Sequence, residues 1–479
     1  MTHRCLTNFM GLKILCIVCL FSIDGIRVDA QPVSNPKPNI ILLMADDLGW
    51  GDVGFNGNEV VKTPHMDRLA HEGMQFNRFY TAAPICSPTR GSVLTGRHPY
   101  RYGILAAHTA GMRQGEITLA ELLKDQGYAT GFFGKWHLGH IDPNHNKPRG
   151  FYSPPNHHGF DAYFATHQSV PTWDPSVTPP GWNRWGQEEG ELWKGIKYFE
   201  NGIQVPDTLM GDDSRVIMDR VIPFIESGAG NGTPFFTCIW FHAPHEPVVA
   251  GPGYLKMYPG LNEAQQHLYG CITAMDDQVG RLMNKLKELG IDEETIVFFC
   301  SDNGPADQLT KEGIASAGPY RGHKHTVYEG GVRVPAFAWW PGKIPAKITG
   351  SIVTTNDYLP TIMDIVGIPT NVLKNRPIDG VSTKELLLGD TEELTGASFF
   401  TGYKRLFKDV DGLAYIKGQF KLLRPTNSKE YELYHLGKDP AELKNIITKY
   451  PKIAAAMKEE MRAWENSCLQ SMQGKDYPY

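Results

Sequence analysis

Cysteine is scarce in this chain, and sequence repeats, heptads and an excess of basic charge are absent from it. Only 8 of the 479 residues are cysteines, and no C-x-x-C pair occurs after residue 30 to offer a zinc site. Lysine and arginine number 47 against 52 aspartates and glutamates, so no basic surface predicts binding to nucleic acid. Without heptads or repeats, the sequence predicts neither a coiled coil nor a solenoid.

No apolar run is long enough for a membrane span. Residues 14–23 form an apolar run that follows two basic residues, but a bilayer span needs about 20 apolar residues. Residues 28–30, V-D-A, offer a cleavage site of the small-residue type. We therefore expect residues 1–30 to be a secretory signal peptide, and the mature chain to be exported to a periplasm, the outside or a lysosome-like compartment. The alternative, an uncleaved anchor, is opposed by Asp24 and Arg27, which end the run early.

An odd number of cysteines remains after the signal peptide. They are Cys86, Cys238, Cys271, Cys300 and Cys468. In an exported protein an odd count leaves at least one thiol unpaired or chemically used. Cys238 and Cys300 lie inside apolar, strand-like runs, so we expect them in the core rather than in a disulfide.

Apolar β-like runs alternate with amphipathic segments along the chain, which predicts an α/β fold with a mostly parallel sheet. Strands are expected at residues 39–44, 129–133, 235–241, 295–301 and 334–340, and helices at 119–126, 213–226, 263–289 and 357–366. Near the C-terminus, short antiparallel strands are expected at 413–416, 420–423 and 432–436, followed by a helix at 452–464. Because 479 residues exceed one ordinary core, we expect a large domain and a smaller one.

Polar clusters follow four of these strands at the point where each strand ends. The clusters are Asp46 with Asp47, Lys135 with His137, His242 with His245, and Asp302 with Asn303. In open α/β sheets, ligands bind outside the carboxyl ends of the strands. We therefore expect all four clusters to converge on one crevice.

The acidic clusters contain only oxygen donors. Asp46, Asp47, Asp302 and Asn303 suit a hard divalent cation, Ca²⁺ first and Mg²⁺ next, in preference to Zn²⁺. Each pair alone also has a simpler interpretation, because D-D and D-N-G are common in turns. Their joint position at matching strand ends favours the metal site.

The remaining clusters supply cationic donors and proton carriers. These residues are Lys135, His137, His242 and Lys324. A sulfate or phosphate ester needs positive groups to gather charge in the transition state and an acid to protonate the leaving oxygen. His245 and His325 are expected to be solvated surface residues or substrate contacts.

Residues 84–96, P-I-C-S-P-T-R-G-S-V-L-T-G, form the most informative stretch of the chain. Pro88 fits the first turn of a helix and Gly96 fits its end, so Cys86 is expected at the N-terminal edge of that helix. The helix N-terminus and Arg90 would both stabilise a thiolate or a bound oxyanion there. The alternative is a buried structural cysteine beside an ordinary turn.

Together these motifs resemble the type I sulfatases, the formylglycine-dependent branch of the alkaline phosphatase superfamily. Residues 86–96 match the signature C-x-P-x-R-x-x-x-L-T-G, and the blocks M-A-D-D-L-G, G-K-W-H-L-G, F-H-A-P-H and S-D-N-G occur in the family's order. The resemblance covers essentially the whole mature chain. It implies an alkaline phosphatase-like fold: a large mixed, mostly parallel sheet flanked by helices, with a small C-terminal subdomain carrying a short antiparallel sheet and a helix. We expect a catalytic domain at residues 31–395 and the subdomain at 396–479.

The resemblance also implies a modified nucleophile and a metal. Cys86 would be oxidised to Cα-formylglycine by a formylglycine-generating enzyme, and the hydrated aldehyde would carry the nucleophilic oxygen. One Ca²⁺ would be held by Asp46, Asp47, Asp302, Asn303 and the modified residue 86.

The same resemblance assigns roles to the cationic residues. Arg90 would orient the hydrate, while Lys135 and Lys324 would bind the sulfate oxygens. His242, helped by Lys324, would protonate the departing alcohol. His137 would take the proton from the second hydroxyl of residue 86, so that sulfate is expelled and the aldehyde returns.

Substrate contacts are less sharply defined. Gln168 and Ser169, which follow a G-F-D segment, compete for a contact with the sulfate. Between residues 144 and 201, Pro and Gly are dense and four tryptophans recur: Trp173, Trp182, Trp185 and Trp193. Such aromatic loops either stack on sugar rings or pin a long loop to the body of the protein.

These observations favour an exported sulfatase that hydrolyses a sulfate ester on a sulfated carbohydrate, such as a glycosaminoglycan or algal polysaccharide fragment. One alternative is a phosphatase or phosphonate monoester hydrolase on the same fold. The oxygen-only ligand set argues against a two-zinc phosphatase, which would need additional histidine ligands. Another alternative is a catalytically silent calcium- or carbohydrate-binding protein whose cysteine was never oxidised.

Overall fold

The centre of the fold is built from strands that are apolar on both faces. Strands β1 (Asn39–Ala45), β7 (Phe235–Trp240) and β8 (Thr295–Ser301) are buried at every residue, as expected of parallel strands with helices on both sides. The computed structural model describes Met1 and residues 37–146, 148–181, 188–374, 376–403, 412–426 and 428–477. The predicted signal peptide therefore lies outside the described residues, apart from Met1.

Within the described residues, residues 37–479 form one compact unit whose main sheet has ten strands in the order β10-β2-β9-β8-β1-β7-β3-β4-β5-β6. Its other strands are β2 (Met74–Tyr80), β3 (Ala129–Lys135), β4 (Ala162–Thr166), β5 (Phe199–Glu200), β6 (Ile203–Gln204), β9 (Ala336–Trp339) and β10 (Lys347–Thr354). Strands β8, β1, β7, β3 and β4 run parallel to one another, as do β10 and β2. Strand β9 is antiparallel to both of its neighbours, and β5 and β6 add an antiparallel edge. The predicted mixed, mostly parallel sheet is confirmed.

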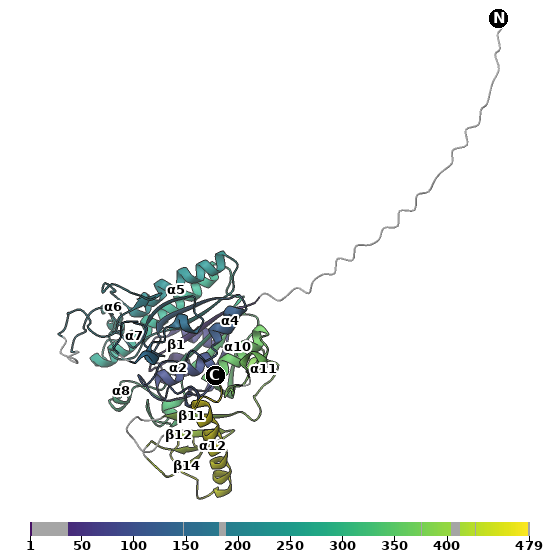
Figure 1. Cartoon of the computed structure of the whole chain (residues 1–479). Coiled ribbons are helices and arrows are strands. Elements are labelled where there is room, and N and C mark those ends of the chain that lie inside the picture. The colour runs from purple at the N-terminus through teal and green to yellow at the C-terminus, as the bar shows by residue number, and fades with distance from the viewer. Residues whose placement is uncertain are drawn as a thin grey trace. The chain divides into compact units, whose positions relative to one another are not determined.

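Helices cover both faces of this sheet (Figure 1). One face packs against α2 (Cys86–Thr95), α4 (Leu119–Asp125), α10 (Tyr358–Val366) and α11 (Lys384–Leu387), and the other against α1 (Pro64–Glu72), α5 (Asp213–Gly230) and α7 (Glu263–Glu288). Along β1, Leu42 and Met44 face the first group and Ile41 and Leu43 the second, because successive side chains of a strand point to opposite faces.

Several short helices connect these elements. They are α3 (Pro99–Tyr102), α6 (Pro252–Leu255), α8 (Asp307–Lys311) and α9 (Glu329–Val332), with 3₁₀ turns η1 (Gly54–Asn56), η2 (Arg149–Phe151), η3 (Pro155–His158), η5 (Thr355–Asp357) and η6 (Thr370–Leu373).

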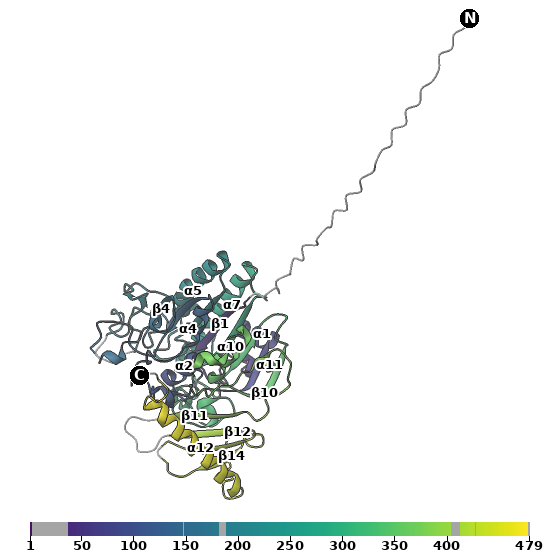
Figure 2. The same ribbon diagram turned by 45° about the vertical axis from the view of Figure 1, so that its right-hand side comes forward.

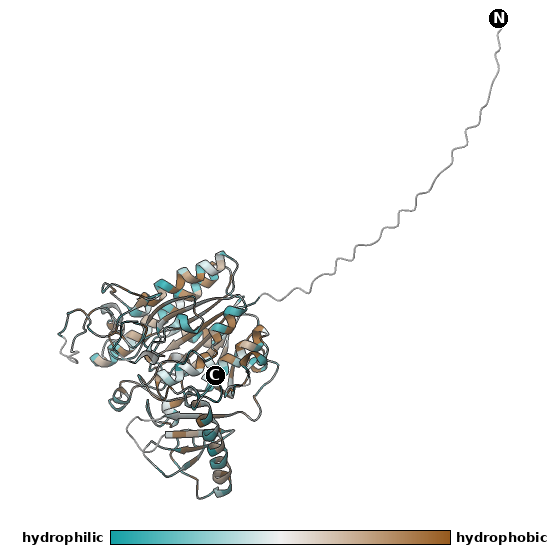
Figure 3. Cartoon of the chain, viewed as in Figure 1, coloured by the Kyte–Doolittle hydropathy of each residue, from teal (hydrophilic) through white to brown (hydrophobic). Residues whose placement is uncertain are grey.

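The C-terminal part contains a second, four-stranded antiparallel sheet in the order β11-β12-β13-β14 (Figure 2). Its strands are β11 (Ser398–Tyr403), β12 (Gly412–Lys417), β13 (Phe420–Arg424) and β14 (Glu432–His435). Helix α12 (Pro451–Met472) packs its apolar residues, among them Met457 and Met461, against one face of this sheet. Figure 3 shows α12 with both hydrophobic and hydrophilic residues, as a helix with one buried face requires. The predicted antiparallel sheet and helix are confirmed, with β11 as an additional strand.

All five cysteines outside the first 30 residues are buried and free. Cys238 lies in β7 and Cys300 in β8, so the prediction that both belong to the core is confirmed. Among the described residues, no helix has the length and apolar character needed to cross a membrane.

Candidate active site

The candidate site lies at the carboxyl ends of four adjacent strands. Strands β8, β1, β7 and β3 are neighbours in the sheet, and each one ends in one of the polar clusters. The parallel register aligns Ala45 of β1 with Ser301 of β8, so the acidic residues that follow both strands meet at one edge. The backbone N–H of Asp47 donates to Asp302 Oδ1 at 3.1 Å.

The acidic residues form one buried cluster of oxygen atoms. The side-chain amide of Asn303 donates to Asp47 Oδ1 at 2.7 Å. Two further buried oxygens, Asp46 Oδ1 and Asn303 Oδ1, accept no hydrogen bond. Buried polar atoms are normally satisfied, so these two acceptors, aligned with neighbouring carboxylates, fit a hard cation.

Two lysines neutralise this cluster. Lys135 Nζ donates to Asp46 Oδ2 at 2.6 Å, and Lys324 Nζ donates to Asp47 Oδ2 at 2.7 Å. Burial opposes ionisation of Asp46, but the charges of Lys135, His245 and Arg90 outweigh it, so the pKa of Asp46 lies well below its usual range. Both lysine ammonium groups therefore lie against carboxylates of the cluster. An anion bound there would contact these two cations.

Arg90 connects the nucleophile helix to the acidic cluster. Its guanidinium donates to Asp302 Oδ2 through Nη2 at 2.6 Å and Nε at 3.1 Å, and to the carbonyl of Lys135 through Nη1 at 2.8 Å. Burial and the negative charge of Asp46 nevertheless raise the pKa of Asp302 to about 7, because both make the ionised form of this carboxyl group less favourable. Arg90, Lys135 and Lys324 thus each pair with one carboxylate of the cluster.

Cys86 is the first residue of α2, as predicted, and Gly96 ends the helix in the left-handed conformation. The Cys86 sulfur lies within 4.8 Å of ligand atoms of Asp46 and Asp302. The side chain is only 2% exposed, and burial raises its pKa although Lys135 and Lys324 oppose the shift. The expectation of a stabilised thiolate is therefore wrong: desolvation outweighs the nearby cations and keeps the thiol protonated.

His137 follows β3 and lies beside a histidine that the sequence did not single out. His137 Nε2 is 3.3 Å from His108 Nδ1, and the amide of Gln168 lies 2.8 Å from the same His108 atom. Burial and the charge of Lys135 hold the pKa of His137 well below its usual range, so the ring is neutral. His108 stands in a connecting segment without any motif, so only the tertiary structure brings it to the site.

His242 is fixed within the protein interior. The side chain is fully buried, with Nδ1 2.8 Å from Asp213 Oδ2 and Nε2 2.7 Å from the hydroxyl of Thr166. Asp213, in the first turn of α5, was also missed, because an acid at that position is ordinarily explained as helix capping. With both ring nitrogens bonded to protein groups, His242 does not suit the role of proton donor to a substrate.

His245, three positions further along the same loop, faces the acidic cluster instead. Its Nε2 is 3.7 Å from Asp47 Oδ2, its side chain is 23% exposed, and Nδ1 lies 2.7 Å from the carbonyl of Glu246. Burial and Lys135 lower the pKa of His245 to about 4, although Asp46 and Asp47 oppose the shift. Of the two histidines in F-H-A-P-H, His245 is the one that borders the site.

The three other residues predicted to contact substrate, Gln168, Ser169 and His325, lie in different places in the structure. The Ser169 hydroxyl donates to Asp46 Oδ2 at 3.4 Å, whereas Gln168 is turned toward His108. His325 stacks on Tyr403, with 5.4 Å between ring centroids, and lines a different cavity. Ser169 therefore lies nearer to the cluster than the other two.

The tryptophan-rich segment is only partly described, because Trp182 and Trp185 lie outside the described residues. Trp193 is 2% exposed, and a Cβ at Gly251 would lie 2.2 Å from the Trp173 ring. Both rings therefore pack against the protein, which favours the interpretation that these aromatics pin the loop.

Two residues of the site have a left-handed backbone. Asp47 and His137 have positive φ angles of 63° and 55°, which side-chain-bearing residues rarely adopt. Such conformations persist where surrounding contacts hold them, and they cluster at functional sites.

The fold and the site together define a hydrolase of the alkaline phosphatase superfamily. Residues 38–368 match the Sulfatase family and residues 321–467 match the family described as N-sulphoglucosamine sulphohydrolase, C-terminal. The chain therefore belongs to the sulfatase family and is a sulfuric ester hydrolase.

Individual relatives agree with this assignment. Arylsulfatase G of Rattus norvegicus is 32% identical over 449 residues, covering 87% of this chain and 78% of its own. N-acetylgalactosamine-6-sulfatase of Canis lupus familiaris is 33% identical over 447 residues, covering 90% and 79%. The crystal structure of Ps i-CgsB in complex with k-i-k-neocarrahexaose has a TM-score of 0.80 at 27% identity, covering 91% of this chain and 94% of that chain.

Proposed function

We propose that this protein is an exported sulfatase that removes sulfate from a sulfated carbohydrate, using a formylglycine made from Cys86 and one Ca²⁺. One observation carries the proposal: Cys86 begins α2 with its sulfur beside Asp46 and Asp302, facing the lysines that neutralise the acidic cluster. The domain boundaries belong to the same proposal: signal peptide at residues 1–30, catalytic domain at 31–395 and C-terminal subdomain at 396–479.

The Ca²⁺ ligands would be Asp46, Asp47, Asp302, Asn303 and the modified residue 86. Asp46 Oδ1 and Asn303 Oδ1 accept no hydrogen bond, and burial and Asp46 raise the pKa of Asp302; both observations support a cation bound at this point. When bound, the ion would lower the pKa of a hydroxyl on residue 86 and neutralise charge on the sulfate.

Conversion of Cys86 removes a difficulty that the thiol itself presents. A buried, protonated thiol is a weak nucleophile, and burial raises the pKa of Cys86. A formylglycine hydrate places two hydroxyls on one carbon, so one attacks sulfur and the other allows sulfate to be expelled. A formylglycine-generating enzyme is the partner that this maturation requires. Arg90, bonded to Asp302, would hold the modified residue in its orientation.

Lys135 and Lys324 would bind the sulfate oxygens. Both ammonium groups already lie at the carboxylates that would hold the metal, so an anion placed against the cluster meets them directly. Ser169, within 3.4 Å of Asp46 Oδ2, is placed to donate to the same anion, whereas Gln168 is not. Fixed cations of this kind stabilise charge that develops in the transition state.

Proton transfer would be divided between His137 and His245. A lowered pKa, caused by burial and Lys135, keeps His137 neutral and able to accept the proton of the second hydroxyl. We assign the donor to the leaving alcohol to His245 rather than to His242, because His242 is enclosed by Asp213 and Thr166. Burial and Lys135 lower the pKa of His245, and the negative charge of a bound sulfate ester would raise it again.

Two comparisons support a carbohydrate as substrate. One relative is an N-acetylgalactosamine-6-sulfatase, and the similar Ps i-CgsB structure holds k-i-k-neocarrahexaose. Glycosaminoglycan and algal polysaccharide fragments are the substrate classes that we propose, with small aryl sulfates as artificial substrates.

Mass spectrometry of the tryptic peptide formed by residues 79–90, from protein of its native source, tests the proposal directly. We expect an aldehyde at residue 86 and hydrolysis of an aryl sulfate by the same preparation. If all of the peptide carries an unmodified thiol at residue 86, the formylglycine mechanism is refuted. Hydrolysis of phosphate esters in place of sulfate esters would contradict the proposed use of Lys135 and Lys324.

A further inference from the structure

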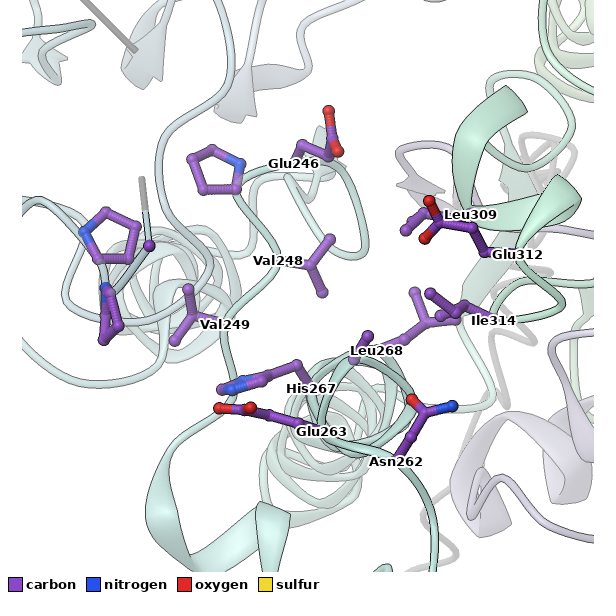
Figure 4. A pocket seen from close by; sticks show the side chains of 15 residues that line it. Glu246, Val248, Val249, Asn262, Glu263, His267, Leu268, Leu309, Glu312 and Ile314 are labelled. Carbon is purple, nitrogen blue, oxygen red and sulfur yellow. The ribbon is translucent and has the colours of Figure 1, made fainter. Parts of the chain in front are cut away.

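A large cavity of about 850 Å³ is lined in part by residues 246–249, which directly follow His245 in the chain (Figure 4). Its walls come from residues 179–181, from residues 246–249, from the first two turns of α7 and from the segment 309–314 at α8. A volume of this size accommodates one or more sugar rings, since drug-sized ligands occupy pockets of about 300–1,000 Å³.

Two walls of this cavity continue directly from residues of the site. Glu246, which lines the cavity, follows His245, and His245 Nε2 is 3.7 Å from Asp47 Oδ2. The segment carrying Leu309 and Glu312 leaves β8 just after Asn303. The cavity therefore adjoins the loop whose His245 borders the acidic cluster.

The cavity carries negative charge where the site carries positive charge. Glu263 and Glu312 lie on different sides of the same space in Figure 4, and no lysine or arginine is among the described residues that line it. His267 does not offset them: its Nδ1 accepts the N–H of Ala250 at 3.0 Å, and burial lowers its pKa, so the ring is neutral. The lining is thus net anionic.

Apolar surface separates these carboxylates. Val248, Val249, Leu268, Leu309 and Ile314 line the cavity together with three prolines. A sugar ring presents C–H groups to such apolar side chains and hydroxyl groups to carboxylates, which are strong acceptors. A second sulfate or a carboxylate in the same place would face the like charge of Glu263 and Glu312, with no lysine or arginine among the described lining residues to pair with.

We propose that this cavity is the subsite for the portion of the substrate next to the reacting sulfate, and that it selects an uncharged, hydroxyl-rich sugar over an anionic one. The inference rests on the proposed function, because it assumes a carbohydrate substrate whose sulfate is bound by Lys135 and Lys324. The enzyme then acts on sulfate groups whose neighbouring sugar unit is itself free of sulfate and carboxylate.

Synthetic aryl sulfates that differ only in the group at the end of an attached tether test this selection, so the natural sugar need not be known. Each probe carries the same aryl sulfate and the same amide-linked tether, made in several lengths, ending in a neutral diol, a carboxylate or a sulfonate. We expect kcat/KM for the diol probe to exceed that for the anionic probes by about tenfold at the tether length that reaches the cavity, since each exposed carboxylate contributes on the order of two- to fivefold. Added salt should reduce the ratio, because it screens exposed charges.

Charge-removing variants locate the effect. The double variant Glu263→Gln with Glu312→Gln should bring the diol and anionic probes to within about twofold of each other, while the parent aryl sulfate without an arm keeps its kcat/KM. Glu288→Gln is the matched control: it removes one carboxylate from the opposite end of α7, where Glu288 pairs with Lys285 at 2.8 Å. That control should keep the full preference.

The outcomes separate the two proposals. If the wild-type protein fails to hydrolyse the parent aryl sulfate, the proposed function and this inference are overturned together. If it hydrolyses the parent but discriminates equally before and after removal of Glu263 and Glu312, or shows no preference at any tether length, only the subsite is refuted.

Discussion

The Asp213 carboxylate lies 2.8 Å from Nδ1 of His242, and both side chains are buried. With the Thr166 hydroxyl at Nε2, both nitrogens of the ring are engaged within the protein. The histidine that the sequence favours as proton donor is therefore enclosed by protein groups, whereas His245 on the same loop borders the acidic cluster. The two histidines should behave differently when changed.

We expect His245→Asn to lower kcat by about 10²–10⁴-fold for an alkyl sulfate and much less for an activated aryl sulfate, because only the poor leaving group needs a proton. His242→Asn should instead lower the free energy of unfolding by about 1–3 kcal/mol, since it leaves the buried Oδ2 of Asp213 without its partner while Tyr198 still donates to Oδ1. Turnover of both esters and urea unfolding of each variant provide the comparison. Selective loss of alkyl sulfate turnover in stable His242→Asn would reverse our assignment.

Cys86→Ala should abolish sulfate release while leaving the fold intact. The side chain is small and buried, so its removal costs little packing, whereas without the thiol the residue cannot be converted to the aldehyde whose hydrate is the nucleophile. Circular dichroism and aryl sulfate turnover measure the two effects. Cys468→Ala, which changes a buried cysteine of α12, is the control and should retain activity. Continued turnover by Cys86→Ala would refute the nucleophile assignment.

Removal of Ca²⁺ by a chelator should lower both the Tm and the activity, and re-addition of the ion should restore them. Asp302→Ala should weaken Ca²⁺ binding, because this carboxylate shares the cluster with Asp46 and Cys86. Calorimetric titration of the metal-free protein measures the affinity. The exposed Asp390→Asn serves as the control for loss of one charge. Equal affinity in Asp302→Ala and the wild type would remove Asp302 from the ligand set.

Stability should rise as the pH falls from 8 to 6, in part through Asp52. Burial raises the pKa of this carboxyl to about 7, although the N–H of Ser316 donates to it at 3.0 Å. Its pKa in the unfolded chain is about 3.9, so between these values the folded state binds more protons, and stability falls as pH rises through the window. Denaturant unfolding across this range should show a smaller slope for Asp52→Asn. An unchanged slope would show that Asp52 titrates normally.

Gly134→Ala should destabilise the protein strongly and impair activity. The residue has φ of 105°, and a Cβ there would lie 1.9 Å from the carbonyl oxygen of Trp240, so β3 would have to move away from β7 just before Lys135. We expect a loss of about 3 kcal/mol or more in denaturant unfolding. Gly350→Ala meets nothing within 4 Å and should be close to neutral. Similar stabilities of the two variants would contradict the close approach at Gly134.

The sequence predicted those parts of the fold in which one local pattern dominates. Strands β1, β3, β7 and β8 were found because their apolar runs are nearly continuous, and α2 because proline and glycine mark its ends. Strands β2 and β10 were missed, since both mix polar and apolar residues and pair with each other at one edge of the sheet. The direction of β9, antiparallel to its neighbours, also followed only from the tertiary arrangement.

The sequence alone determined which chemical groups are present and that the strand ends would gather them: carboxylates after two strands, basic residues after two others and a cysteine at a helix start. The tertiary structure decided what each group does there. Burial keeps the Cys86 thiol protonated, although the helix N-terminus and Arg90 favour the thiolate. Asp213 and Thr166 enclose His242, while His245 lies at the site. His108 reached His137 from a segment without a motif. Desolvation and contacts between distant segments depend on the whole fold, so no local pattern carries them.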